Sequence, residues 1–277
     1  MLTVIIPSKN EKFLDNTIRD VLENATGEIE VLPVLDGYET EEIDDPRVTY
    51  VKLPPTGHSK KRQGINLAVS EAKGEYVMSL DAHCLVAKGF DEQLIKDHKP
   101  NWVQVPRRHR LDAEKWCLQS QGDGRPPIDY EYIMYPPRFK PMLGFHGFKW
   151  DARTKERADI MIDDILTFQG SCWFMTKEWF NKCGFMDLRY MGWGQEAEEL
   201  SFTTWQNGGE VKINKNTYYA HLHKGKKYGR MYFMSRDENR KSYKYSYERW
   251  KDDPTFEKLI NKFMPMPNWS NNWKEEL

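Results

Sequence analysis

The residues best suited to chemistry are Asp81 and His83, which directly follow the β-prone apolar run Tyr76–Leu80. Side chains two residues apart on an extended chain point to the same side, so both can reach one point beyond the end of the strand. Ligands bind at that end of the strands in open α/β sheets. A carboxylate oxygen together with an imidazole nitrogen suits a divalent ion such as Mn²⁺. Taken alone, this pattern is more typical of a solvated strand exit, because short motifs often match by chance.

Strands and helices alternate in the sequence around this pair. Apolar runs predict strands at residues 2–6, 29–35, 48–53 and 76–80, and helical spacing predicts helices at residues 11–24, 59–73 and 88–98. This alternation indicates an α/β fold with a mostly parallel sheet and helices on both faces. The order is similar to a nucleotide-binding half-fold, but neither glycine-rich phosphate-binding motif is present. A metal at Asp81 and His83 would then hold the phosphates.

The sequence after residue 106 is less regular. It predicts strands at residues 102–106, 168–175, 211–213 and 217–220, and helices at residues 177–183 and from about Gly192 to Asn207. Residues 107–164 are rich in proline, glycine and aromatic residues, and we predict long loops there that form the acceptor side of a cleft. Residues 264–273 are rich in proline and tryptophan and predict an extended arm.

The composition is that of a folded protein without a strong overall charge. The 277 residues carry 41 Lys and Arg against 42 Asp and Glu, so any attraction to nucleic acid or membrane must come from local patches. The four cysteines lack zinc-site spacing and are interpreted as reduced thiols. The apolar start is too short for a signal peptide, and no stretch is long enough to span a bilayer. We therefore expect a cytoplasmic protein (in the host cytoplasm if it is viral) with no membrane partner.

Six segments resemble, in one order, the motifs of a known family. The chain resembles GT-A-fold, family-2-like glycosyltransferases, most closely the polypeptide N-acetylgalactosaminyltransferase type. The matching segments are Val4–Pro7, Leu35–Asp36, Leu80–Cys84, Gln169–Phe174, Trp193–Phe202 and Ala220–His223. The resemblance implies a Rossmann-like catalytic domain at residues 1–225, with a nucleotide-binding half (1–100) and an acceptor-side half (101–225). Residues 226–277 would form a C-terminal extension packed on the same domain.

The resemblance also implies a metal-dependent reaction with a UDP-sugar donor. Asp81, His83 and His221 would hold Mn²⁺ or Mg²⁺, with His223 as the rival third ligand. Glu196 would bind sugar hydroxyls or act as a base, and Trp193 would wall the sugar pocket. Further substrate-binding candidates are Pro7, Ser8, Asp36, Arg62, Gly170, Ser171, Glu199, His223, Lys227 and Arg230.

Several of these assignments have plain structural alternatives. Asp36 would accept hydrogen bonds from the pyrimidine or ribose, but an Asp-Gly pair is also a turn signal. Arg62 could contact the uracil or the diphosphate, or it could simply be an exposed basic residue of a first helical turn. Glu199 lies three residues after Glu196, on the same helical face. Ala197 replaces the Asn of the family motif and cannot act as a base. This leaves either a retaining mechanism or Glu196 as the base.

The acceptor is suggested only by the stretch at residues 221–251. It holds ten Lys or Arg against three Asp or Glu, interleaved with seven aromatic residues. One interpretation is a flap that closes over the donor diphosphate. Another is a surface that tracks phosphates and stacks bases, which favours a hydroxymethylated pyrimidine in DNA as the acceptor. A saccharide or Ser/Thr hydroxyl, or a binding module without turnover, stays open, as does the oligomeric state.

Overall fold

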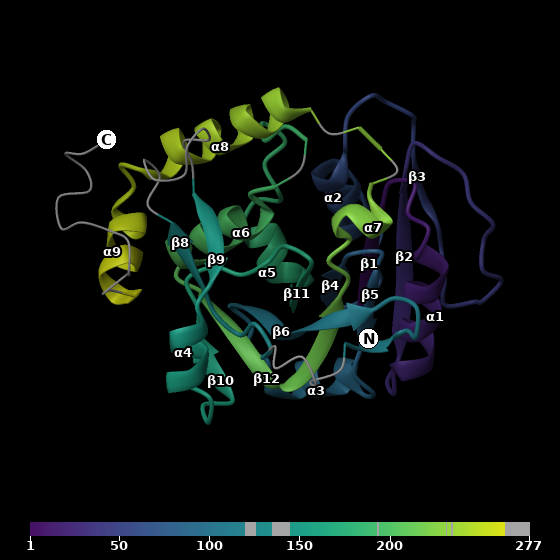
Figure 1. Cartoon of the computed structure of the whole chain (residues 1–277), viewed down its shortest axis with the longest axis horizontal. Coiled ribbons are helices and arrows are strands. Elements are labelled where there is room, and N and C mark those ends of the chain that lie inside the picture. The colour runs from purple at the N-terminus through teal and green to yellow at the C-terminus, as the bar shows by residue number, and fades with distance from the viewer. Residues whose placement is uncertain (120–125, 135–144, 193, 231, 234, 264–277) are drawn as a thin grey trace.

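A mixed β-sheet forms the centre of the structure (Figure 1). The structure is a computed structural model that describes residues 1–119, 126–134, 145–192, 194–230, 232–233 and 235–263. In these residues the main path of the sheet has the strand order β10-β12-β6-β11-β4-β1-β2-β3, with β5 paired to β12 and β7 paired to β6. The strands are β1 (Leu2–Ser8), β2 (Ile29–Asp36), β3 (Val51–Leu53), β4 (Tyr76–Leu80), β5 (Cys84–Val86), β6 (Trp102–Asp112), β7 (Cys117–Leu118), β10 (Ile162–Asp164), β11 (Cys172–Thr176) and β12 (Glu210–His221).

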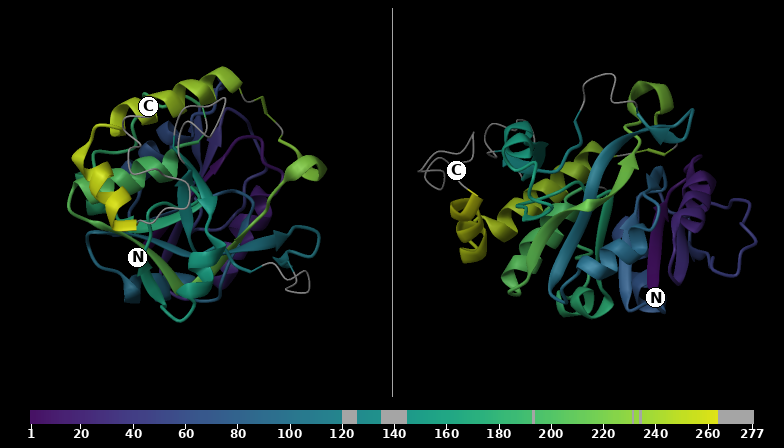
Figure 2. Two further views of the ribbon diagram at one scale, coloured as in Figure 1. Left: turned by 60° about the vertical axis from the view of Figure 1, so that its left-hand side comes forward. Right: turned by 90° about the horizontal axis from the view of Figure 1, so that it is seen from below.

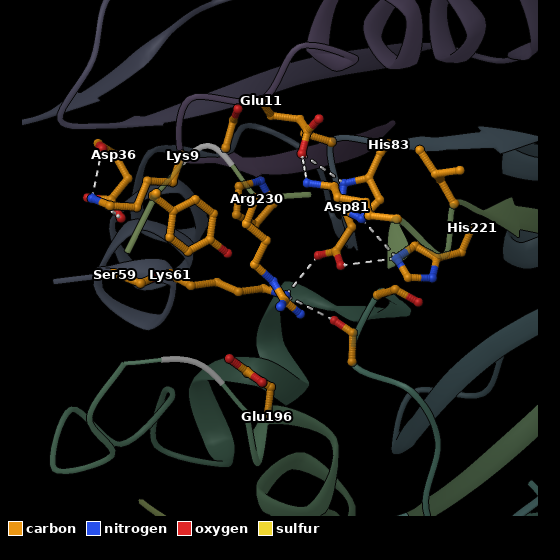
Figure 3. A pocket seen from close by; sticks show the side chains of 18 of the residues that line it. Lys9, Glu11, Asp36, Ser59, Lys61, Asp81, His83, Glu196, His221 and Arg230 are labelled. Atoms are coloured by element: carbon orange, nitrogen blue, oxygen red, sulfur yellow. Dashed lines mark hydrogen bonds and ion pairs between the residues drawn. The ribbon is translucent and has the colours of Figure 1, made fainter. Parts of the chain in front are cut away.

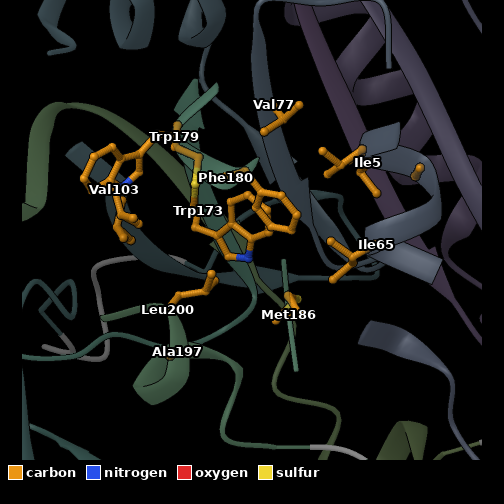
Figure 4. Close-up of a cluster of buried hydrophobic side chains, with 14 of the residues drawn as sticks. Ile5, Ile65, Val77, Val103, Trp173, Trp179, Phe180, Met186, Ala197 and Leu200 are labelled. Atoms are coloured by element: carbon orange, nitrogen blue, oxygen red, sulfur yellow. The ribbon is translucent and has the colours of Figure 1, made fainter. Parts of the chain in front are cut away.

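Helices cover both faces of this sheet because its strands alternate between two apolar cores. On β1, Val4 and Ile6 belong to a core shared with α1 and α3, whereas Ile5 belongs to the opposite core, shared with α2, α5 and α6. Figure 4 shows the second core, in which the rings of Trp173 and Phe180 stack. The helices are α1 (Leu14–Asn24), α2 (Lys61–Glu71), α3 (Phe90–Asp97), α4 (Asp151–Glu156), α5 (Lys177–Lys182), α6 (Glu196–Gln206), α7 (Gly225–Tyr228), α8 (Arg236–Trp250) and α9 (Pro254–Phe263).

The parallel strands bring the ends of several predicted segments to one edge. The strands β1, β2 and β4 run parallel, so their carboxyl ends meet at one edge. Strand β11 runs antiparallel to β4 with Cys172 opposite Leu80, so the residues before β11 lie beside Asp81. Strand β12 pairs with β5 with His221 opposite Cys84, so its last residue reaches the same place. The pairing thus assembles one site from distant parts of the chain.

The second half is more regular than the sequence predicts. Residues 107–164 were expected to be long loops, and that prediction is wrong for much of the segment: β6 runs on to Asp112, and β7, α4, β10 and a separate hairpin follow. The hairpin consists of β8 (Glu131–Met134) and β9 (His146–Lys149). The two short strands expected at residues 211–220 form one long strand, β12, beside β6 (Figure 2), with a register shift between Asn214 and Tyr218. Residues 120–125, 135–144 and the predicted arm at 264–273 lie outside the described residues.

The basic, aromatic stretch at residues 221–251 contains the helices α7 and α8. Its last part is α8, which begins at Ser235, whose hydroxyl accepts a hydrogen bond from the amide of Glu238. Trp250 of α8 and Phe256 of α9 share an apolar cluster with Phe202 of α6. The C-terminal helices therefore pack on the helix that carries Glu196. None of the helices in the described ranges is long and apolar enough to cross a bilayer.

Candidate metal and nucleotide site

The candidate site is a pocket of about 720 Å³ at the shared edge of the strands (Figure 3). The end of β1, the residues before α2, the exit of β4, the residues before β11, the start of α6 and the segment after β12 all line it. The predicted residues that line the pocket are Pro7, Ser8, Asp36, Asp81, His83, Gly170, Ser171, Glu196, His221, His223 and Arg230. The structure therefore brings most of the predicted set into one cavity.

Asp81, His83 and His221 form a cluster that could hold a metal ion. One ligand atom of each lies within 4.8 Å of the others. The two Nε2 atoms are 3.0 Å apart, and His221 Nε2 is 3.7 Å from the Asp81 carboxylate. Burial lowers the pKa of His221 well below its usual value, and the neighbouring His83 adds to this shift. A neutral imidazole offers its lone pair to a metal, so this donor set fits a divalent ion.

The geometry of the cluster favours His221 over His223 as the third metal ligand. His221 belongs to the cluster and is buried, whereas His223 also lines the pocket but is exposed and stands outside the cluster. Their rings are 5.2 Å apart, centroid to centroid. The antiparallel pairing of β12 with β5 places His221 next to the turn that carries His83, whose carbonyl accepts a hydrogen bond from the amide of Leu222.

Lys61 is a site residue that the sequence argument missed. Its ammonium group lies 2.8 Å from Asp81 Oδ1 and donates a hydrogen bond to the carbonyl of Gly170, 3.2 Å away. Burial opposes the charge of Lys61, but the carboxylates of Asp81 and Glu196 outweigh it and raise its pKa. Lys61 is the middle residue of three consecutive basic residues, and that run carries no signal of which side chain faces the pocket.

Asp36 lies at the other end of the pocket with one free carboxylate oxygen. Its Oδ2 accepts a hydrogen bond from the amide of Lys60 at 2.8 Å and lies 3.3 Å from the ammonium of Lys9. Its Oδ1 is buried and has no hydrogen-bond partner among the described residues. A buried oxygen without a partner is costly, so this atom is suited to accept a hydrogen bond from a bound ligand. The next residue, Gly37, has φ +74° and lies so close to Pro55 that a side chain would clash.

Glu196 enters the pocket from the first turn of α6. Its neighbour Ala197 packs into the apolar core below, which fixes the direction of the helix. Gly170 makes this approach possible, because a Cβ atom there would lie only 3.3 Å from the Cβ of Glu196. In Figure 3, Glu196 lies across the pocket from Asp36 and the metal cluster, with Lys61 between them.

Three residues that the sequence predicts to bind substrate do not line the pocket. Arg62 and Glu199 are both buried and form an ion pair at 3.0 Å, and neither lines the pocket. Arg62 also donates a hydrogen bond to the carbonyl of Gly194, so it supports the turn before Glu196 instead of meeting a diphosphate. Lys227 is exposed, pairs with Glu114 and is likewise not part of the lining. Trp193 lies outside the described residues.

Comparison with known proteins shows the family of this chain. Residues 3–184 match the family described as "Glycosyl transferase family 2". The chain belongs to this family. It is 26% identical over 242 residues to polypeptide N-acetylgalactosaminyltransferase 3 of Taeniopygia guttata, covering 81% of this chain and 38% of that protein. It is 25% identical to polypeptide N-acetylgalactosaminyltransferase 10 of Homo sapiens, again covering 38% of the relative. The chain thus spans about two fifths of the length of these relatives.

Solved structures confirm the predicted GT-A fold. A crystal structure of GalNAc-T7 with UDP, GalNAc and Mn²⁺ superposes with a TM-score of 0.71 at 18% identity, covering all of this chain and 54% of that one. A structure of S. aureus TarS in complex with UDP-GlcNAc gives a TM-score of 0.53 at 13% identity, covering 84% of this chain and 62% of that one. The family-2 resemblance and the α/β fold class expected from the sequence are therefore both correct.

Proposed function

We propose that residues 1–225 form a metal-dependent glycosyltransferase that moves a sugar from a UDP-sugar to an acceptor hydroxyl. One observation carries the proposal: the ligand cluster of Asp81, His83 and His221 shares a single pocket with the unpartnered carboxylate oxygen of Asp36. A nucleoside diphosphate offers a polar base edge at one end and a charged diphosphate at the other. Membership of glycosyl transferase family 2 supports this assignment.

The base end of the pocket fits uracil. In uracil the ring nitrogen N3 carries a hydrogen, and this N–H could donate to Asp36 Oδ1. In cytosine N3 is an acceptor, so the same carboxylate would face a lone pair. Such a mismatch leaves a buried polar group without a partner and costs about 1–3 kcal/mol. The pocket should therefore prefer UDP to CDP.

The other end of the pocket fits a diphosphate that gains a further negative charge as it leaves the sugar. A Mn²⁺ ion held by Asp81, His83 and His221 would stabilise the leaving charge and orient the donor. Lys61 adds a positive charge beside Asp81, and Lys224 and Arg230 also line the pocket. Charged donors form the strongest hydrogen bonds to phosphate oxygens. These cations support departure of the diphosphate without a proton donor.

Retention of the anomeric configuration is the stereochemical outcome that we propose. An inverting reaction needs a base that activates the acceptor from the opposite side of the sugar. Ala197 offers no such group, and Glu198 is buried near the amide of Gly147 and does not line the pocket. Glu196 is the acidic side chain of α6 that reaches the pocket, where it would hold sugar hydroxyls.

We propose a Ser or Thr hydroxyl of a polypeptide as the acceptor, because the two relatives described above are named polypeptide N-acetylgalactosaminyltransferases. The structure supports the DNA acceptor expected from the sequence only weakly. Tyr243 and Trp250 are buried, and Tyr245 packs edge-on against Tyr190, so these three rings are not free to stack on bases, whereas Phe233 of the same stretch is 80% exposed. The names of the relatives point to polypeptides, so we propose a polypeptide acceptor in place of DNA. The cytoplasmic location and a viral source stay untested predictions.

The decisive experiment measures UDP release from a panel of UDP-sugars with Mn²⁺, with and without Ser/Thr-containing peptides. We expect peptide-stimulated release that EDTA abolishes. His83→Ala and His221→Ala should each lower the rate about 100-fold or more, because each removes a ligand. His223→Ala is the matched control and should retain metal-dependent activity.

Each alternative gives a distinct result in this assay. Stimulation by oligosaccharides alone would move the acceptor to saccharides, and stimulation by hydroxymethylated DNA would restore the discarded acceptor. Full activity in His83→Ala would refute the metal assignment. No release and no binding of any nucleotide sugar would leave a binding module without turnover.

A further inference from the structure

We propose that Glu11 is a positioning residue that fixes the ring of His83 for metal binding and ties the segment after β12 to the same point. This inference rests on the proposed function, since it concerns the metal site of that reaction. Glu11 follows β1, far in sequence from both of its partners, and its side chain is only 8% exposed. A buried carboxylate needs partners, and the structure supplies two of them.

The two partners meet at one carboxylate oxygen. Glu11 Oε2 lies 3.3 Å from His83 Nδ1 and also forms a close ion pair with the ammonium of Lys224 (Figure 3). The contact with Nδ1 is longer and less well aligned than an ideal hydrogen bond. Its effect is therefore mainly electrostatic: a negative charge beside Nδ1 favours a hydrogen on that nitrogen.

The position of that hydrogen decides whether His83 can bind a metal. His83 Nε2 faces the cluster, 3.0 Å from His221 Nε2. A neutral imidazole carries one hydrogen, so a hydrogen on Nδ1 leaves the lone pair on Nε2. Metal-ligating histidines usually give their other N–H to a carboxylate or carbonyl, which fixes the tautomer and the ring orientation. Glu11 is placed to select the tautomer of His83 that binds a metal.

The contact with Lys224 links this selection to the wall of the pocket. Lys224 precedes α7, in a stretch of which Leu222, Gly229 and Arg230 also line the pocket. Because one oxygen holds both groups, a shift of this stretch changes the charge that His83 experiences. The nearby pair of Lys227 with Glu114 ties α7 down as well, but both of its side chains are exposed and neither lines the pocket.

The test compares these two ion pairs by direct Mn²⁺ binding. Electron paramagnetic resonance of free Mn²⁺ gives the affinity of the 277-residue chain without donor, so the result is independent of turnover. Glu11→Ala should weaken binding about 10- to 100-fold, the usual effect of losing such a partner. Glu11→Gln should fall between Glu11→Ala and the wild type. Lys224→Met leaves the charge of the Glu11 carboxylate beside His83 unneutralised and should bind Mn²⁺ at least as tightly as the wild type. The control Glu114→Gln breaks an exposed pair and should stay within about threefold.

A second readout separates positioning from a merely structural role. The ¹⁵N shifts of the ring nitrogens of His83, recorded on labelled protein, report which nitrogen carries the hydrogen. We expect the Nδ1–H form in the wild type and in Glu114→Gln, and a mixture of both tautomers in Glu11→Ala. A circular dichroism melt confirms that each variant is folded.

The outcomes keep the two proposals apart. If the wild type binds Mn²⁺ and His83→Ala does not, the metal site stands whatever the Glu11 variants do. In that case an unchanged Mn²⁺ affinity and tautomer in Glu11→Ala would overturn the role of Glu11 alone. If Glu11→Ala does not fold, Glu11→Gln decides in the same way. If the wild type fails to bind Mn²⁺, both proposals are overturned.

Discussion

The donor side and the α6 side of the pocket are held in place by different kinds of interaction. On the donor side Asp36 and Asp81 stand at the ends of buried parallel strands, and sheet hydrogen bonds fix their backbone. On the α6 side Glu196 follows an irregular turn, and buried charges hold that turn. Arg62 contacts Glu199 there, and Glu199 in turn accepts a hydrogen bond from the amide of Asp187.

This difference determines where each side is sensitive to mutation. Sheet hydrogen bonds come from the backbone, so most side-chain changes leave them intact. A buried ion pair depends on both side chains, and removal of one leaves the other charged and unpaired. We therefore expect the α6 side to respond more strongly to single charge changes than the donor side, even though the chemistry of the donor side is more exacting.

The largest expected effect is that of Arg62→Met. Glu199 is 3% exposed and would lose its nearest charged partner, since Arg249 lies 3.9 Å away. Glu196 would lose a cation 3.7 Å away, and the carbonyl of Gly194 would lose its donor. We expect a loss of about 3–5 kcal/mol in the free energy of unfolding, the usual cost of breaking a buried ion pair. Urea unfolding measures this loss.

Two further variants sharpen this comparison. Arg19→Met breaks an exposed pair with Asp15 and should leave the free energy of unfolding nearly unchanged. In the double variant Arg62→Met/Glu199→Gln the orphaned charge is gone, so part of the stability should return. Equal losses in Arg62→Met and Arg19→Met would show that the α6 side does not depend on its buried charge.

Glu198 should give the α6 side a pH dependence of stability. Burial raises the pKa of Glu198 from 4.5 to about 8, against opposing hydrogen bonds from its own amide and that of Gly147. Between these values the folded protein keeps a proton that the unfolded chain has released. Stability is therefore lost as the pH rises toward 8. From pH 6.5 to 8 the loss should approach about 2 kcal/mol.

Glu198→Gln is the variant that isolates this effect. Gln cannot ionise, so the difference in unfolding free energy between the variant and the wild type should shift in favour of the variant from pH 6.5 to pH 8. The histidines whose pKa burial lowers, such as His98, titrate below this window and are common to both proteins. A constant difference across the window would mean that Glu198 ionises normally in the folded protein.

The contrast between strand ends held by backbone hydrogen bonds and a turn held by distant charged side chains also explains which site residues the sequence could predict. The period-two spacing of Asp81 and His83 after an apolar strand, together with the order of the family motifs, placed both at the site, because strand geometry is local. Arg62 was assigned to the donor since nothing in its neighbourhood reveals that Glu199, 137 residues away, pairs with it. Lys61 and Glu11 were missed for the same reason: their partners come from other elements.

Helix α8 has a regular spacing of buried residues that the charged composition of its segment concealed. Tyr243, Ser246 and Trp250 are buried at helical spacing on α8, although the segment as a whole is strongly charged. That spacing, together with Ser235 as a helix start, could have identified the helix and the face it buries. The abundance of Lys, Arg and Tyr pointed instead to nucleic acid, because composition does not say which rings are exposed.

The smallest effect that we expect on the α6 side concerns the turn that leads into Glu196. Gln195 has φ 65°, a left-handed conformation that costs a residue with a side chain about 1 kcal/mol relative to glycine. Its side-chain amide donates a hydrogen bond to the carbonyl of Phe145 at 2.6 Å, which offsets that cost. Gln195→Ala keeps the strained backbone and loses the hydrogen bond, so it should cost about 1–2 kcal/mol in urea unfolding.

Gln195→Gly separates the two contributions. It loses the same hydrogen bond but relieves the left-handed strain, so it should be less destabilised than Gln195→Ala by about 1 kcal/mol. Equal stability of the two variants would show that the turn is unstrained at this position. A fully stable Gln195→Ala would show instead that the contact with Phe145 contributes nothing. This second result would mean that side-chain contacts contribute less to the stability of the α6 side than we infer from its comparison with the donor side.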